Sequence, residues 1–142
     1  MRSKQVVFTG VLMMAAFFTR PIDATRQAAA GQAAPTPVVV EVTLNEWKVE
    51  MPTTTLKAGP TTFKTTNAGE KTHTLKVESD KLEDKTLKKI SKELPHDLKT
   101  NEKGEMTIDL KPGTYKATCP IGLGAHKRHG MELAFTVVAR QP

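Results

Sequence analysis

The chain has very little of several things that whole classes of protein depend on. Its 142 residues include a single cysteine, Cys119, so a disulfide within the chain is excluded. Aromatic residues make up 5% of the sequence, and its 21 basic residues are interspersed with 15 acidic ones. Nucleic-acid binding usually needs clustered basic residues together with aromatic side chains. We therefore expect no nucleic-acid partner.

The chain also lacks an apolar run long enough to cross a membrane comfortably, which takes about 20 residues. Its most apolar run, residues 6–18, follows Arg2 and Lys4. A basic start before a short apolar run is typical of a secretory signal peptide. We predict a signal peptide over residues 1–24 and a periplasmic or otherwise exported protein. The alternative is an uncleaved anchor that tethers the domain to a membrane.

Residues 25–37 are rich in Ala, Gln, Gly and Pro and have no hydrophobic period, which predicts a flexible linker. The folded domain is then expected over residues 38–142, which is long enough to bury a core without a disulfide. Removing residues 1–24 takes away three basic residues and one acidic residue, which leaves 18 and 14. This modest positive balance favours acidic partners.

Short runs of alternating apolar and polar residues recur along most of this domain. β-branched and aromatic residues are frequent in them, and Pro, Gly and Asn stand between them, as expected for strands and turns. Trp47 and Val49 are expected to continue an extended edge after the first strand. About seven short strands predict an all-β sandwich. The strands are expected over residues 38–44, 53–57, 61–66, 72–77, 105–110, 115–119 and 132–138.

One segment has a different period. Leu87, Ile90 and Leu94 stand at helical spacing among Lys and Glu residues, and Pro95 follows them. An apolar stripe of this kind ended by proline is typical of an amphipathic helix. We therefore predict one short helix over residues 83–94, inserted between strands and packed on the sheets.

Residues that bind soft metals gather near the end of the chain. Cys119, His126 and Met131 share one loop between two predicted strands, and His73 stands at the head of an earlier strand. Two histidines and one cysteine with a weak bond to methionine form the blue-copper ligand set. A lone thiol in an oxidising compartment needs an explanation, and a metal provides one. The pattern therefore predicts a copper site.

Each candidate ligand has an alternative interpretation. His129 competes with His126, but it lies two residues before Met131, which leaves little chain for two separate ligand directions around one metal. His126 is therefore the favoured ligand. Met131 and Cys119 can also serve as core packing, and His73 can simply cap a strand.

Two motifs resemble those of the cupredoxins, the family of small copper proteins that includes the plastocyanins. The segment from Asn67-Ala68-Gly69 to His73 is similar to the first-histidine loop of that family. The segment from Gly113-Thr114-Tyr115 through Cys119-Pro120 to Met131 is similar to its ligand loop, although the stretch between cysteine and histidine is longer than in plastocyanins. The resemblance covers residues 38–138. It implies a Greek-key β-sandwich in which Asn67 ties the first-histidine loop to the Cys119 loop.

The resemblance also implies a function. It implies a type 1 copper protein that carries single electrons between exported or membrane redox proteins. No enzyme activity, catalytic residue or small-molecule substrate is expected, because a closed four-ligand site leaves no open metal position. The redox partner is expected to present an acidic docking patch to Lys127 and Arg128. One copper ion, alternating between Cu(I) and Cu(II), is expected on His73, Cys119, His126 and Met131.

A second function remains open from the residues alone. A periplasmic copper-binding module for copper storage, delivery or resistance would use many of the same side chains. Such a module needs exposed, exchangeable ligands. The cluster of His126, Lys127, Arg128 and His129 is compatible with this alternative.

Overall fold

Nine strands and one short helix make up the part of the chain that this computed structural model describes, residues 36–141. The predicted signal peptide over residues 1–24, and the predicted linker as far as residue 35, lie outside the described residues. In chain order the elements are β1 (Val38–Asn45), β2 (Lys48–Glu50), β3 (Thr55–Lys57), β4 (Gly59–Asn67), β5 (Lys76–Leu82), β6 (Ser91–Glu93), β7 (Lys103–Leu110), β8 (Gly113–Thr118), α1 (Ala125–Arg128) and β9 (Glu132–Val138).

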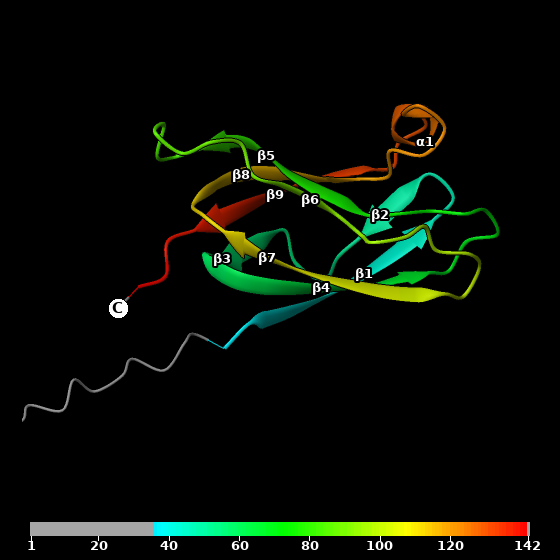
Figure 1. Cartoon of the computed structure of the whole chain (residues 1–142), viewed down its shortest axis with the longest axis horizontal. Helices are drawn as coiled ribbons and strands as arrows, with labels where there is room; N and C mark the ends of the chain where they lie inside the picture. Colours follow the sequence, from blue (N-terminus) through cyan, green and yellow to red (C-terminus); the bar gives the residue numbers. More distant parts are fainter. Residues whose placement is uncertain (1–35, 142) are drawn as a thin grey trace, which may run out of the picture. The chain divides into compact units, whose positions relative to one another are not determined.

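The strands form two sheets that lie one above the other (Figure 1). One sheet has the order β2-β1-β4-β7, and the other has the order β3-β9-β8-β5-β6. β1 pairs with β4 and β3 pairs with β9 in parallel, while the remaining pairs are antiparallel. Successive strands cross repeatedly from one sheet to the other, as in a Greek-key sandwich. The all-β sandwich predicted from the sequence is confirmed.

The hydrophobic core lies between the sheets and follows from the alternation in the sequence. In β1 the side chains of Val40, Val42 and Leu44 are buried, while the residues between them are not. Period-two patterning of this kind places one face of a strand on the core. Both sheets contribute aromatic rings: Tyr115 stacks on Phe135 with ring centroids 5.4 Å apart, and Phe63 lies 6.1 Å from Phe135.

The prediction of a helix over residues 83–94 is wrong. Residues 83–90 form turns and irregular chain, and β6 pairs with β5 at the edge of the five-stranded sheet. Ser79 holds Ile90 in place: the Ile90 N–H donates to Ser79 Oγ at 2.9 Å, and the Ile90 carbonyl accepts from the Ser79 N–H at 2.7 Å. Leu87 is 40% exposed. Pairing with a neighbouring strand has outweighed a helical period carried by three residues.

The helix that is present has four residues and lies in the loop between β8 and β9. Among residues 36–141, none of the helices has the length and apolar character needed to span a membrane. Trp47 also differs from expectation. It lies in the tight turn between β1 and β2 with a φ of 64°, so it does not continue an extended edge.

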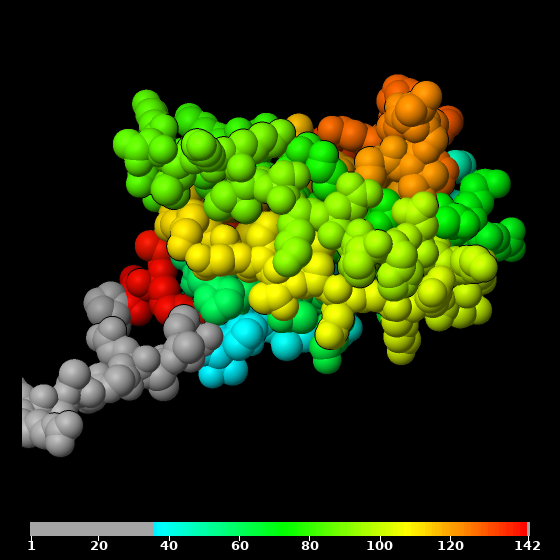
Figure 2. Space-filling model, in the orientation of Figure 1, coloured from blue at the N-terminus to red at the C-terminus, as the bar shows by residue number. Residues whose placement is uncertain are grey.

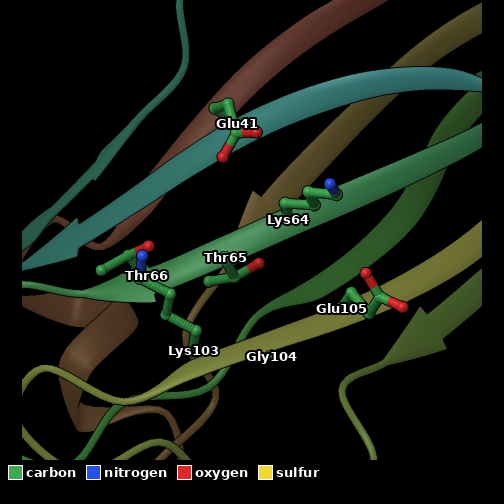
Figure 3. A pocket seen from close by; sticks show the side chains of 7 residues that line it. All are labelled: Glu41, Lys64, Thr65, Thr66, Lys103, Gly104 and Glu105. Carbon is green, nitrogen blue, oxygen red and sulfur yellow. The ribbon is translucent and has the colours of Figure 1, made fainter.

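A shallow groove crosses the four-stranded sheet over β1, β4 and β7 (Figure 3). Three of its charged residues alternate in sign from strand to strand, because Glu41 is paired in register with Lys64, and Lys64 with Glu105. Opposite charges on neighbouring strands stabilise a sheet by roughly 0.2–1 kcal/mol per pair. None of the predicted metal ligands lines this groove.

Tyr115 offers a test of how the core is held. Its hydroxyl donates to the Lys111 carbonyl at 2.8 Å and accepts from the Lys111 N–H at 3.0 Å, and burial raises its pKa. Tyr115→Phe leaves both backbone groups without this partner, which costs about 1–3 kcal/mol. We expect this loss in the free energy of unfolding measured with urea. Thr114→Ala is the control, because its exposed hydroxyl makes only a 3.5 Å contact; equal effects of the two variants would contradict the assignment.

Candidate metal centre

Segments that are far apart in the sequence meet at one end of the sandwich. They are the β1–β2 turn, the chain between β4 and β5, and the β8–β9 loop that carries α1 (Figure 1). In the space-filling view the β8–β9 loop, coloured orange, stands out from the surface at that end (Figure 2). The β1–β2 turn and the β8–β9 loop each connect neighbouring strands of one sheet, and the chain between β4 and β5 passes from one sheet to the other.

Backbone hydrogen bonds hold His73 in place. Its N–H donates to the Leu98 carbonyl at 3.0 Å, and its carbonyl accepts from the Leu98 N–H at 2.7 Å. The two residues form an isolated antiparallel bridge that joins the chain between β4 and β5 to the chain between β6 and β7. The imidazole is fully buried, so the ring can adopt few orientations.

Cys119 follows directly after β8, where the strand leaves the sheet. Its N–H donates to the Met131 carbonyl at 3.1 Å, which joins the two ends of the β8–β9 loop. Burial raises the pKa of the Cys119 thiol, and hydrogen bonds from the backbone N–H groups of Thr74 and Ile121 partly offset this. These two N–H groups are oriented to support a thiolate once a cation is present.

α1 presents His126 to this cysteine. Gly122 and Gly124 precede it with φ values of 68° and 79°, a region that glycine enters without steric strain. These residues turn the chain back so that His126 faces inward from the helical turn. The Met131 N–H then donates to the His126 carbonyl at 3.1 Å, which closes the loop.

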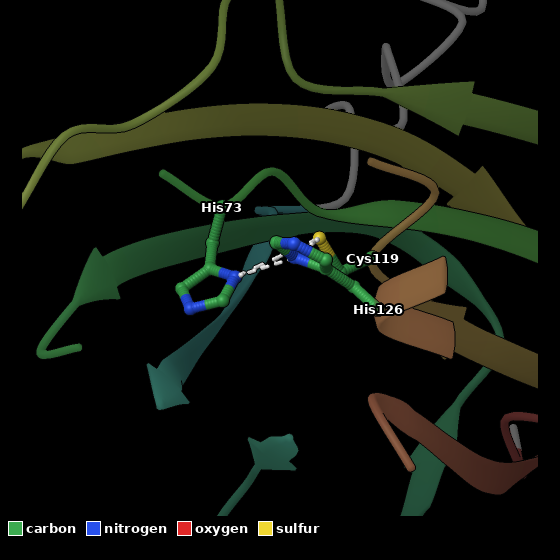
Figure 4. Close-up of side chains that lie close together, drawn as sticks. All are labelled: His73, Cys119 and His126. Atoms are coloured by element: carbon green, nitrogen blue, oxygen red, sulfur yellow. Dashed lines mark hydrogen bonds between the residues drawn. The ribbon is translucent and has the colours of Figure 1, made fainter. Parts of the chain in front are cut away.

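The structure brings His73, Cys119 and His126 together in one cluster (Figure 4). The two histidine Nδ1 atoms lie 3.1 Å apart, and Cys119 Sγ lies 3.5 Å from His126 Nδ1 and 3.8 Å from His73 Nδ1. A cation held at about 2 Å from nitrogen and about 2.3 Å from sulfur leaves gaps of this order between its ligands. Burial, and next the neighbouring His73, lower the pKa of His126. Imidazole nitrogen and thiolate sulfur are donors that copper prefers, so the residues of this cluster fit copper.

The backbone of Met131 is hydrogen-bonded to the backbones of Cys119 and His126, and the Met131 side chain is fully buried. Its role as the fourth ligand stays a prediction from the sequence. His129 is placed elsewhere: its ring is exposed and packs against Trp47, with ring centroids 4.6 Å apart. Of the two competing histidines, it is His126 that lies in the cluster.

The role expected for Asn67 needs correction. Both N–H groups of its side chain are used, donating to the carbonyls of Lys71 at 2.7 Å and Leu98 at 2.9 Å. Its Oδ1 accepts from the Gly69 N–H at 2.9 Å. Asn67 therefore organises the first-histidine loop itself and joins it to the chain near Leu98. The link to Cys119 comes instead from the backbone of Thr74.

Glu46 is a residue of this site that sequence reasoning missed. Its Oε1 lies 3.2 Å from His73 Nε2 and accepts from the Lys71 N–H at 2.7 Å. The backbone N–H of Lys71, with further help from His73, lowers the pKa of Glu46 to about 2. No spacing in the sequence indicates this contact, because it depends on the turn at Trp47.

Comparison with known proteins agrees with this geometry. A family model described as a cupredoxin-like domain matches residues 10–130. The chain belongs to the cupredoxin family. The resemblance seen in the sequence is therefore confirmed. No curated protein matches this cupredoxin.

Solved structures of similar fold include three auracyanins. Auracyanin A, a "blue" copper protein from Chloroflexus aurantiacus, is 20% identical, with a TM-score of 0.56 over 72% of this chain and 99% of its own. Auracyanin B is 20% identical, with a TM-score of 0.55 over 73% and 91%. Dithionite-reduced auracyanin from Roseiflexus castenholzii is 16% identical, with a TM-score of 0.53 over 74% and 98%. At these identities the likeness concerns the fold.

The correction for Asn67 leads to a test. Asn67→Ala removes three hydrogen bonds from a fully buried position, and each buried group left unpaired costs about 1–3 kcal/mol. We expect the metal-free protein to lose at least about 2 kcal/mol in urea unfolding. Asn45→Ala, which removes one 3.2 Å bond to Glu50, is the matched control and should cost less than about 1 kcal/mol. A loss below that for Asn67→Ala would contradict the role.

Proposed function

We propose that this cupredoxin binds one copper ion and carries single electrons between exported or membrane redox proteins. The observation that supports it is the convergence of one thiol and two imidazole Nδ1 atoms within 3.1–3.8 Å of one another. This is the donor set of a blue-copper site, with Met131 as the weak fourth ligand.

Bound copper would supply the one-electron couple, and the residues of the chain supply the conditions for it. Strand ends and backbone bridges hold His73 and Cys119, and both side chains are fully buried. A site held in this way changes little in geometry when its charge changes. A buried site also excludes the water that would otherwise reorganise around the new charge.

The burial of these side chains favours a carrier over a copper-delivery module. Delivery requires ligands that a partner can reach and replace, whereas His73, Cys119 and Met131 have no exposed surface. His126 is the most accessible of the four, being half-buried. The same closure supports the expectation that the protein is not an enzyme, since a substrate would need an open position at the metal.

The half-buried edge of His126 indicates where a redox partner would approach. Trp47 packs edge-on against this ring at 5.2 Å, and Leu123 near it is 99% exposed. Lys127 and Arg128 are exposed in the same loop. A partner with an acidic docking patch would therefore meet an apolar surface bordered by positive charge. Export rests on the predicted signal peptide over residues 1–24.

The visible absorption spectrum of the protein loaded with Cu(II) tests this function. We expect an intense blue band from thiolate-to-copper charge transfer that bleaches on reduction and returns on oxidation. Cys119→Ser should abolish the band, because a hydroxyl at this position cannot supply the thiolate.

Two histidine variants sharpen the result. His126→Ala should remove or strongly shift the band, whereas His129→Ala, from the same loop, should keep it. A colourless protein that still binds Cu(I) tightly would favour copper storage or delivery. Failure to bind copper in either oxidation state would end the metal assignment.

A further inference from the structure

The carboxylate of Glu46 occupies the outer side of the His73 ring. Glu46 Oε1 lies 3.2 Å from Nε2, while Nδ1 of the same ring faces His126 and Cys119. An ionised carboxylate only accepts hydrogen bonds, so Nε2 must carry the proton. In the neutral ring this tautomer leaves the lone pair on Nδ1, the nitrogen that faces the cluster. A carboxylate on the far nitrogen of a ligand histidine fixes its tautomer and raises its basicity.

The protein is built to receive this carboxylate. A Cβ at Gly69 would lie 2.6 and 2.7 Å from the two carboxylate oxygens of Glu46, closer than real contacts allow. The Lys71 N–H donates to the same carboxylate. Asn67 holds this loop in shape through the Gly69 N–H and the Lys71 carbonyl. The cradle therefore comprises a donor, a residue without a side chain and an asparagine that fixes both.

We propose that Glu46 is a positioning residue for His73, and that its negative charge favours Cu(II) over Cu(I) at the site. The second half of this inference rests on the proposed copper function. The first half concerns the metal-free protein and stands apart from it.

The physical basis is the difference in charge between the two oxidation states. A fixed negative charge near a metal stabilises the more positive state, and burial of the intervening ring reduces screening by water. A more basic imidazole acts in the same direction. Glu46→Gln removes the charge and keeps an oxygen that can accept from Nε2–H. Glu46→Ala removes both the charge and the hydrogen bond.

The first experiment measures the reduction potential and the Cu(II) and Cu(I) affinities of the full chain. We expect Glu46→Gln to lower the ratio of Cu(II) to Cu(I) affinity about tenfold, a rise of about 59 mV in a one-electron couple. Glu50→Gln is the matched control, because Glu50 lies on the same hairpin but contacts Lys48 and Asn45. The reduction potential of this variant should equal that of the unmodified protein. An unchanged potential in Glu46→Gln would overturn the charge effect.

Gly69→Ala tests the cradle while leaving the charge of Glu46 in the protein. The three atoms nearest to its added methyl all belong to the flexible side chain of Glu46, so the fold should persist. We expect the potential to move in the same direction as in Glu46→Gln and by a smaller amount. A potential equal to that of the unmodified protein would contradict the cradle.

The second experiment needs no metal. Nitrogen-15 NMR of the imidazoles in the metal-free protein should show His73 fixed as the Nε2–H tautomer. Glu46→Ala should release it to a mixture, and the Glu50→Gln control should not. A His73 tautomer that is mixed in the unmodified protein, or unaffected by Glu46→Ala, would overturn the positioning role. If copper fails to bind, the proposed function fails while this measurement still decides the role of Glu46.

Discussion

The close approach of a thiol and two imidazoles in a water-poor site is the constraint on which the rest of the structure depends. Buried polar groups need partners, and here the Nδ1 atoms of two histidines lie 3.1 Å from each other and within 3.8 Å of Cys119 Sγ. Such an arrangement persists only where the backbone leaves the side chains little alternative. The bridge at Leu98, the contact between Cys119 and Met131 and the closed β8–β9 loop provide that constraint.

The sandwich contributes through its order of strands. Parallel pairing of β1 with β4 places the β1–β2 turn beside the chain that leads to His73. Antiparallel pairing of β8 with β9 returns the ligand loop to the point at which it began. The site therefore depends on loops at one end of the two sheets, and aliphatic and aromatic side chains pack in the core between the sheets.

Sequence patterns predicted what depends on local chemistry. The strand at residues 132–138 and the cluster of His73, Cys119 and His126 follow from alternation and from ligand types. The conformation of residues 83–94 could not be predicted in this way, because it depends on the pairing of β6 with β5. The contact between Glu46 and His73 joins residues 27 positions apart across a turn with positive φ. Only the three-dimensional arrangement shows it.

The position of Trp47 gives the molecule an optical probe of its own. It is the single tryptophan of the chain, and its ring packs against both His126 and His129. Tryptophan emission from this protein therefore arises at one place, the β1–β2 turn where it packs against the β8–β9 loop. Fluorescence will record opening of this end of the sandwich, and it will report unfolding at the far ends of the sheets only when that disturbance reaches the β1–β2 turn.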